Sequence, residues 1–229
     1  MDGVTFDLTQ TPLREVNHFL YRHLTYNGGQ TVKILNPDGA HNLAVGLDAP
    51  VEVAIMGHAG YYAASMNKQA NVTIFGNVGT GVAENMMSGR VHVKGFASVS
   101  AGASAHGGLL IIDGNASLRC GISLKGADIV VGGNVGSFSA FMAQAGRIVV
   151  CGDAGNALGD SLYEAVIYVR GNIKSLGADA QIEPMSEVDY KAIGELLDKA
   201  GFSYNPNEFK RVASAKQLYH WNADANQEY

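Results

Sequence analysis

The sequence has 229 residues and a formal net charge of −5, with 16% charged residues and 29 glycines. The absence of a basic run excludes a protein that holds a nucleic-acid backbone, and no run of eighteen apolar residues predicts a membrane span. Many glycines with few charges favour a chain that turns often and buries most of its strands, not a helical bundle.

Two further features concern the cellular compartment. The first residues lack the basic start and apolar core of a secretory signal peptide. Cys120 and Cys151 are the two cysteines, and they form neither a CxxC motif nor a disulfide framework. We therefore expect a protein of the reduced cytoplasm.

Residues 1–30 are predicted to form an N-terminal segment with a capping helix. Thr11 suits the N-cap, Pro12 suits the first turn, and Glu15 places a negative charge near the helix start. The helix is expected to run to about Leu24.

Residues 31–185 are dominated by a repeat of 19 residues. Its marker is a column of glycines: Gly57, Gly76, Gly95, Gly114, Gly133, Gly152 and Gly171. Aliphatic residues stand four before, two before and two after each glycine, as in Val53, Ile55 and Ala59. Spacing by two is typical of a strand with one buried face, and 19 residues cannot hold a helix plus two strands. The repeat predicts an all-β fold, a parallel β-helix of about eight coils. The eighth, degenerate coil begins near Ile34, with residues 42–44 aligned to residues 61–63.

Other columns of the repeat predict finer features. The column between the first two aliphatic ones is mixed, as expected of an outward or partner-facing side. The glycines are expected to make corners with positive φ, and the Asn and Asp residues that follow them to form a structural ladder up the stack. A second short strand is predicted around Tyr61–Ala64, Gly81–Glu84 and Phe138–Phe141. A row of small residues should mark where opposite walls approach closely: Ala64, Ala83, Gly102, Gly121, Ala140 and Gly159. Asp128 and Arg147 share a column on adjacent coils, which predicts a surface ion pair.

Residues 186–229 are predicted to form a C-terminal helix and a docking tail. An open β-helix needs caps because its end strands present unpaired backbone groups. Ser186 begins a helix that is expected to end near Ala200, with Gly201 as its stop. The tail that follows contains Trp221 and three other aromatic residues, so it either folds back on the β-helix or docks on another subunit.

A search for chemistry finds no candidate catalytic, cofactor-binding or metal-binding residue. The seven histidines show no metal-ligand spacing, and no two of them share a column on adjacent coils. Glu84 and Asp160 share a column but stand four coils apart, which is about 19 Å and too far for a glycosidase pair. Residues 76–81 are not a nucleotide loop, because their pattern recurs as plain coil corners. The two cysteines lie in different columns, which argues against a shared iron–sulfur cluster.

Several stretches carry a resemblance to a known family. They are Thr5–Leu8, Thr11–Glu15, Gly60–Ala63, Val82–Gly89, Gly89–Val93, Gly146–Val150 and Leu218–His220. With the glycine-punctuated coils, they resemble the C-terminal β-helix domain of the glutamate synthase large subunit, the GXGXG domain. The stand-alone form of this domain, a subunit of methylamine–glutamate N-methyltransferase (N-methylglutamate synthase), looks closer still.

The resemblance implies a right-handed β-helix in a hetero-oligomeric enzyme complex. It implies two partners, a class II glutamine amidotransferase-like subunit and a glutamate synthase-like subunit that carries FMN and an iron–sulfur cluster. Such a complex would form N-methyl-L-glutamate and ammonia from methylamine and L-glutamate. In this family the β-helix carries no catalytic or cofactor residues, so this chain is expected to be a scaffold that is inactive alone.

Two alternatives stay open. The chain could serve as the β-helix subunit of a formylmethanofuran dehydrogenase-type complex, whose β-helix it also resembles. It could instead be an autonomous carbohydrate-binding protein or lyase, although the sequence lacks the acidic or basic cluster that such a protein needs.

Overall fold

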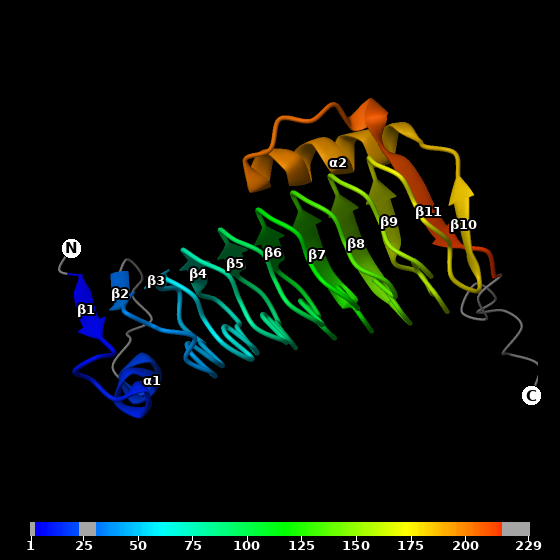
Figure 1. The fold of residues 1–229 in the computed structure, drawn as a ribbon. Helices are drawn as coiled ribbons and strands as arrows, with labels where there is room; N and C mark the ends of the chain where they lie inside the picture. Colours follow the sequence, from blue (N-terminus) through cyan, green and yellow to red (C-terminus); the bar gives the residue numbers. More distant parts are fainter. Residues whose placement is uncertain (1–2, 23–30, 217–229) are drawn as a thin grey trace, which may run out of the picture.

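The computed structural model describes residues 3–22 and 31–216. Its strands form one sheet with the order β1-β2-β3-β4-β5-β6-β7-β8-β9-β11-β10, wound as a parallel β-helix of about seven turns (Figure 1). The strands are β1 (Val4–Asp7), β2 (Thr31–Leu35), β3 (Glu52–Met56), β4 (Asn71–Ile74), β5 (Arg90–Val93), β6 (Leu109–Ile112), β7 (Lys125–Val131), β8 (Ala145–Val150), β9 (Val166–Val169), β10 (Ala180–Glu183) and β11 (Lys210–Ser214). The helices are α1 (Leu13–Arg22), α2 (Glu187–Ala200) and a 3₁₀ turn, η1 (Pro206–Glu208). None of the helices in the described ranges is long and apolar enough to cross a membrane.

The register of β3 to β9 follows the 19-residue repeat. Val91, Leu110 and Ile129 are successive Cα partners in parallel strands, and all three are fully buried. Each coil therefore stacks like residues on like residues, and the aliphatic columns fill the interior of the β-helix. This confirms the architecture that the repeat predicts.

The first coil departs from the predicted alignment. Val32 of β2 pairs with Val53, 21 residues later. On the opposite wall, the amide of Asn42 donates to the carbonyl of Tyr61 as the amide of Tyr62 donates to that of Thr80, so Asn42 is equivalent to Tyr62. The alignment of residues 42–44 with residues 61–63 is therefore wrong by one residue.

The predicted second strand is absent from the described coils, and turns take its place. In each coil, residues with positive φ alternate with ordinary ones, as at Tyr62, Ala64 and Met66. The Tyr62 and Met66 amides donate to the next coil, whereas the Ala64 amide donates back to Leu43. This alternation satisfies the backbone without the continuous extended conformation that a strand requires. A row of single parallel bridges, such as Ala59 with Val78, joins this wall to the strands.

The glycine column has a different cause from the one predicted. Of its seven members, only Gly57 has a positive φ. A Cβ on Gly76 would instead lie 2.6 Å from the carbonyl carbon and oxygen of Gly57 and 2.7 Å from the amide nitrogen of His58. Glycine is required because successive coils approach too closely at this corner for any side chain.

The row of small residues confirms the predicted close approach. Gly102 and Gly121 have positive φ, and a Cβ on Gly102 would lie 2.6 Å from Cδ1 of Ile129 in the facing strand wall. The alanines of the row, such as Ala83 and Ala140, are fully buried. The turn wall therefore rests directly on the aliphatic columns of the strand wall.

Helix α1 covers the N-terminal end of the stack. Val16 and Leu20 are buried in the main core. Asn17 accepts a hydrogen bond from the amide of Ala44 at 3.1 Å and donates to the carbonyl of Asn42 at 2.9 Å. Strand β1 adds to β2 in parallel beside it.

Helix α2 lies along the side of the stack, not over its end (Figure 1). It begins at Ser186 with a capping box and ends at Gly201 in the left-handed conformation, as the sequence predicts. Its apolar residues pack on the outward column of β6 to β9, namely Ile111, Val130, Val149 and Tyr168. The C-terminal end is instead closed by β11, which pairs antiparallel with β9 and with β10. The tail thus folds back on the β-helix as far as residue 216, and Trp221 lies outside the described residues.

Candidate functional site

The Asn and Asp ladder is a structural feature. Each ladder side chain accepts a hydrogen bond from the backbone amide of the next ladder residue, 19 positions later. The pairs are His58 with Asn77, Asn77 with Phe96, Asn115 with Asn134, Asn134 with Asp153, and Asp153 with Asn172, at 2.7 to 3.0 Å. These acceptors hold one coil to the next, which confirms the ladder over a row of ligand-binding groups.

The predicted ion pair is also present. Nε and Nη2 of Arg147 each donate to one carboxylate oxygen of Asp128, both at 2.7 Å. The pair is bidentate and partly exposed, so its contribution to stability is about 1 kcal/mol or less.

Sequence reasoning missed a buried polar chain beside the end of α2. Nε2 of His92 lies 2.6 Å from Oδ1 of Asp113, and Lys94 approaches the other oxygen at 3.3 Å. On the other side of the ring, Nη2 of Arg90 lies 3.3 Å from Nδ1 of His92 and 3.3 Å from the carbonyl oxygen of Lys199 in α2. His92 and Asp113 are diagonal neighbours on adjacent strands, so a search within single columns overlooks them.

The geometry of this chain of polar groups fits a neutral His92. Nδ1 faces the donor Arg90 and so accepts, which leaves the proton on Nε2 to be donated to Asp113. Burial lowers the pKa of His92, and the hydrogen bond to Asp113 opposes that effect only in part. Both ring nitrogens are thus engaged in contacts that tie the end of α2 to the sheet.

The two cysteines lie on opposite sides of the strand wall. Cys120 is buried inside the β-helix, whereas Cys151 is buried under α2. Burial raises the pKa of each thiol to about 12, so neither is a reactive thiolate near neutral pH. They cannot share one metal cluster without dismantling the wall between them.

The carboxylates Glu84 and Asp160 are also not brought together. Glu84 lies in the turn wall after β4 and Asp160 in the turn wall after β8, four coils along the stack. Asp160 accepts from the Ser161 hydroxyl at 2.9 Å and from the Ala178 amide at 3.3 Å. Across residues 3–22 and 31–216, no group of three or more His, Cys, Asp and Glu side chains is placed to hold a metal ion.

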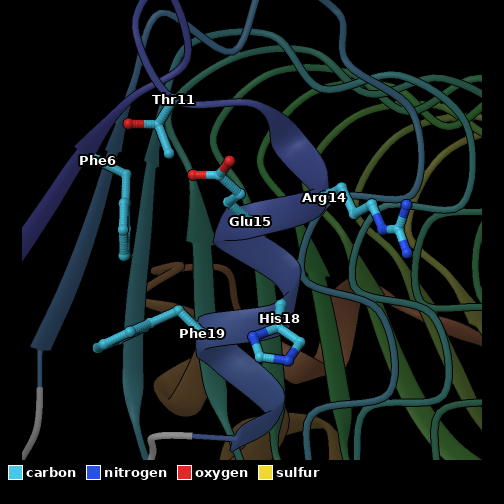
Figure 2. A pocket seen from close by; sticks show the side chains of 6 residues that line it. All are labelled: Phe6, Thr11, Arg14, Glu15, His18 and Phe19. Carbon is cyan, nitrogen blue, oxygen red and sulfur yellow. The ribbon is translucent and has the colours of Figure 1, made fainter.

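A shallow pocket of about 580 Å³ opens at the N-terminal end, between β1 and α1. Its lining residues are Phe6, Thr11, Arg14, Glu15, His18 and Phe19 (Figure 2). Phe6 and Phe19 meet edge to face with ring centroids 5.0 Å apart, while the polar residues form the opposite rim. The mixed charges and open shape suit a contact surface more than a catalytic centre.

A second unclaimed surface is the outward face of β2 to β5, which α2 leaves uncovered (Figure 1). We call it the open sheet face. Its outward residues are Lys33, Glu52, Ala54, Met56, Asn71, Thr73, Phe75, Arg90, His92 and Lys94. Phe75 is 48% exposed and Met56 is 36% exposed. The sequence signal for this face is the mixed outward column of the repeat.

Comparison with known proteins gives one strong match along nearly the whole chain. The protein GlxC of Rhizobium meliloti (strain 1021) is 54% identical over 219 residues, which are 95% of this chain and 96% of that protein. No protein-family model matches the chain. An identity this high over this length means that the coils and both flanking segments are shared, and the chain therefore belongs to the GlxC family.

Proposed function

We propose that this chain is a non-catalytic β-helix subunit of a glutamate-synthase-like complex. It would hold a class II glutamine amidotransferase-like subunit and a subunit with FMN and an iron–sulfur cluster in fixed geometry. The most specific form of the proposal is methylamine–glutamate N-methyltransferase. In that reaction methylamine replaces the amino group of L-glutamate, giving N-methyl-L-glutamate and ammonia.

One observation carries the scaffold role: the polar groups best placed for chemistry already hold the stack together. The ladder side chains accept from the next coil, His92 links the sheet to α2, and both thiols are buried. A residue that must change its protonation or bind substrate cannot also be a fixed structural acceptor without strain on the fold.

The type of complex is supported by resemblance. The glycine-punctuated coils are similar to the GXGXG domain of glutamate synthase, and the GlxC relative matches the chain along almost its full length. The uniform coils leave little material for a substrate cleft, which favours a surface built for packing against other subunits.

The proposal is tested by purifying the tagged chain from the cells that produce it and identifying the proteins that accompany it. We expect amidotransferase-like and flavin-containing chains, and formation of N-methyl-L-glutamate from methylamine and L-glutamate by the complex. The chain purified alone should show no flavin absorbance and no turnover. Flavin bound to the isolated chain would contradict the scaffold role.

The same purification distinguishes the alternatives. Molybdenum or tungsten enzyme subunits in place of the flavin subunit would indicate a formylmethanofuran dehydrogenase-type complex. An absence of partners together with binding in a glycan screen would indicate a carbohydrate-binding protein.

A further inference from the structure

We infer that the open sheet face binds an amphipathic helix of a partner subunit, laid in line with α2. This inference rests on the proposed role in a complex and adds the surface and the kind of segment that occupies it. The wall that would receive this helix already carries one of the chain's own.

Helix α2 shows what this wall accepts. Its residues Ile193, Leu196 and Leu197 are buried on the outward column of β6 to β9. Near its start, Asp189 accepts from the hydroxyl of Tyr168 on β9 at 2.7 Å, and near its end Arg90 on β5 donates to the carbonyl of Lys199. The helix therefore runs along the stack and crosses the strands, and it stops where β5 begins the open sheet face.

The same column continues beyond α2 without a cover. Its residues are fully or almost fully buried from Ile111 to Tyr168, whereas Thr73 and Ala54 are partly exposed and Lys33 is exposed. Small residues in the centre allow a helix backbone to approach closely. Phe75 and Met56 stand beside them as exposed apolar anchors for the side chains of such a helix.

The dimensions fit a short helix. The strands β2 to β5 span three spacings of about 4.8 Å, or roughly 14 Å. A helix of about ten residues covers 15 Å, which leaves it end to end with α2. Its apolar residues would recur at i, i+3, i+4 and i+7, as in other helices that lie in grooves.

Charge indicates the chemistry of the other faces of that helix. Although the whole chain has a net charge of −5, the open sheet face carries Lys33, Arg90 and Lys94 against Glu52. Of these, Lys94 is shared with Asp113 and Glu52 accepts from Asn71 at 2.6 Å. A helix with acidic residues beside its apolar stripe complements this surface.

The first test uses a photo-crosslinking residue at position 75 in the full chain, with position 118 as control. Leu118 is similarly exposed, at 49%, but lies on the turn wall. After irradiation of the producing cells, mass spectrometry should find position 75 joined to one acidic, amphipathic segment of a partner subunit. Crosslinks to residues 23–30 or 217–229 of the same chain, or to a second copy, would overturn the inference.

The second test measures retention of the partners by the tagged chain. Met56→Lys/Phe75→Lys should weaken retention of one partner by about tenfold or more, as expected for loss of exposed apolar anchors. Leu118→Lys should leave retention unchanged, and all variants should keep the circular dichroism and urea midpoint of the unchanged chain. A complex that survives the double substitution overturns the inference alone, whereas failure of the unchanged chain to retain any partner overturns the proposed function as well.

Discussion

At the scale of single residues, the coil spacing decides which positions tolerate a side chain. The corner glycines lie against the backbone of the preceding coil, and the three atoms that a methyl group on Gly76 would meet most closely all belong to backbone. Backbone in the middle of a stack cannot move aside without breaking the hydrogen bonds of both neighbouring coils. The constraint is therefore steric, and it is independent of the φ that the residue adopts.

Gly76→Ala should lower the free energy of unfolding by about 1–3 kcal/mol or more, because it overpacks a site that cannot relax. The measurement is the urea midpoint, followed by circular dichroism. Gly194→Ala in α2 is the matched control, since its methyl group would meet no atom closer than 3.8 Å and alanine favours the helix by about 0.5–1 kcal/mol. Equal effects of the two substitutions would contradict the steric account.

His92 predicts a pH dependence of stability. Burial lowers its pKa in the folded protein, where Arg90 and Lys94 also disfavour the cation and Asp113 favours it. Below the ordinary pKa of about 6.5 the unfolded chain therefore binds a proton that the folded chain does not, and the free energy of unfolding decreases as the pH falls towards the folded-state pKa.

His92→Gln should reduce this loss, because the amide of glutamine can donate to Asp113 and accept from Arg90 without titrating. Urea midpoints measured between about pH 5 and 7 test it, in the range where histidine ordinarily changes charge. An unchanged slope in the variant would show that another group is responsible.

At the scale of elements, α2 is fixed by its first turn as well as by its apolar side. Asp189 accepts from the backbone amide of Ser186 at 2.8 Å and from its hydroxyl at 2.6 Å. Burial alone would raise the pKa of Asp189, but the hydrogen bonds from Ser186 and Tyr168 outweigh it and lower the pKa. The carboxylate also contacts Arg211 of β11 at 3.3 Å, so one residue joins the helix, β9 and the closing strand.

Ser186→Ala should lower the free energy of unfolding by about 1 kcal/mol, as the loss of an N-cap side chain does. Val188→Ala is the control on the same turn, since Val188 is 76% exposed and surface changes have effects within about 0.5 kcal/mol. Thermal unfolding of both variants measures the difference. A Ser186→Ala protein as stable as the control would mean that Tyr168 and Arg211 suffice to hold the helix start.

At the scale of the whole molecule, stability depends on neighbouring coils and on closed ends. A coil in the middle has a partner on each side, but the first and last coils have only one. Helix α1 closes the first end with Val16 and Leu20, and β11 closes the last by pairing with β9.

Val16→Asp/Leu20→Asp should detach α1 and expose the apolar first coil, so the protein should associate as its concentration rises. Light scattering after size-exclusion chromatography measures this. Arg14→Asp, on the exposed side of the same helix, should remain as the unchanged protein. Association of both variants alike would indicate that charge, not the loss of the cap, is the cause.

The candidate surfaces were less predictable than the coils. The Asp128–Arg147 pair follows from a single column, but the His92–Asp113 link runs diagonally between columns. The open sheet face depends on where α2 stops, and the amphipathic pattern of α2 does not say which surface it covers. The pocket beside Phe6 requires the packing of α1 on β1, which a local pattern cannot give.

The amino-acid sequence by itself determined the parallel β-helix, its register from β3 to β9, the ladder and both helix starts, because a fixed repeat forces like residues to lie above one another. Only the tertiary structure decided that turns replace a second strand, that the glycine column is steric, and that α2 lies along the wall while β11 closes the end. These features depend on distances between coils and between surfaces distant in sequence, which no periodicity within the chain encodes.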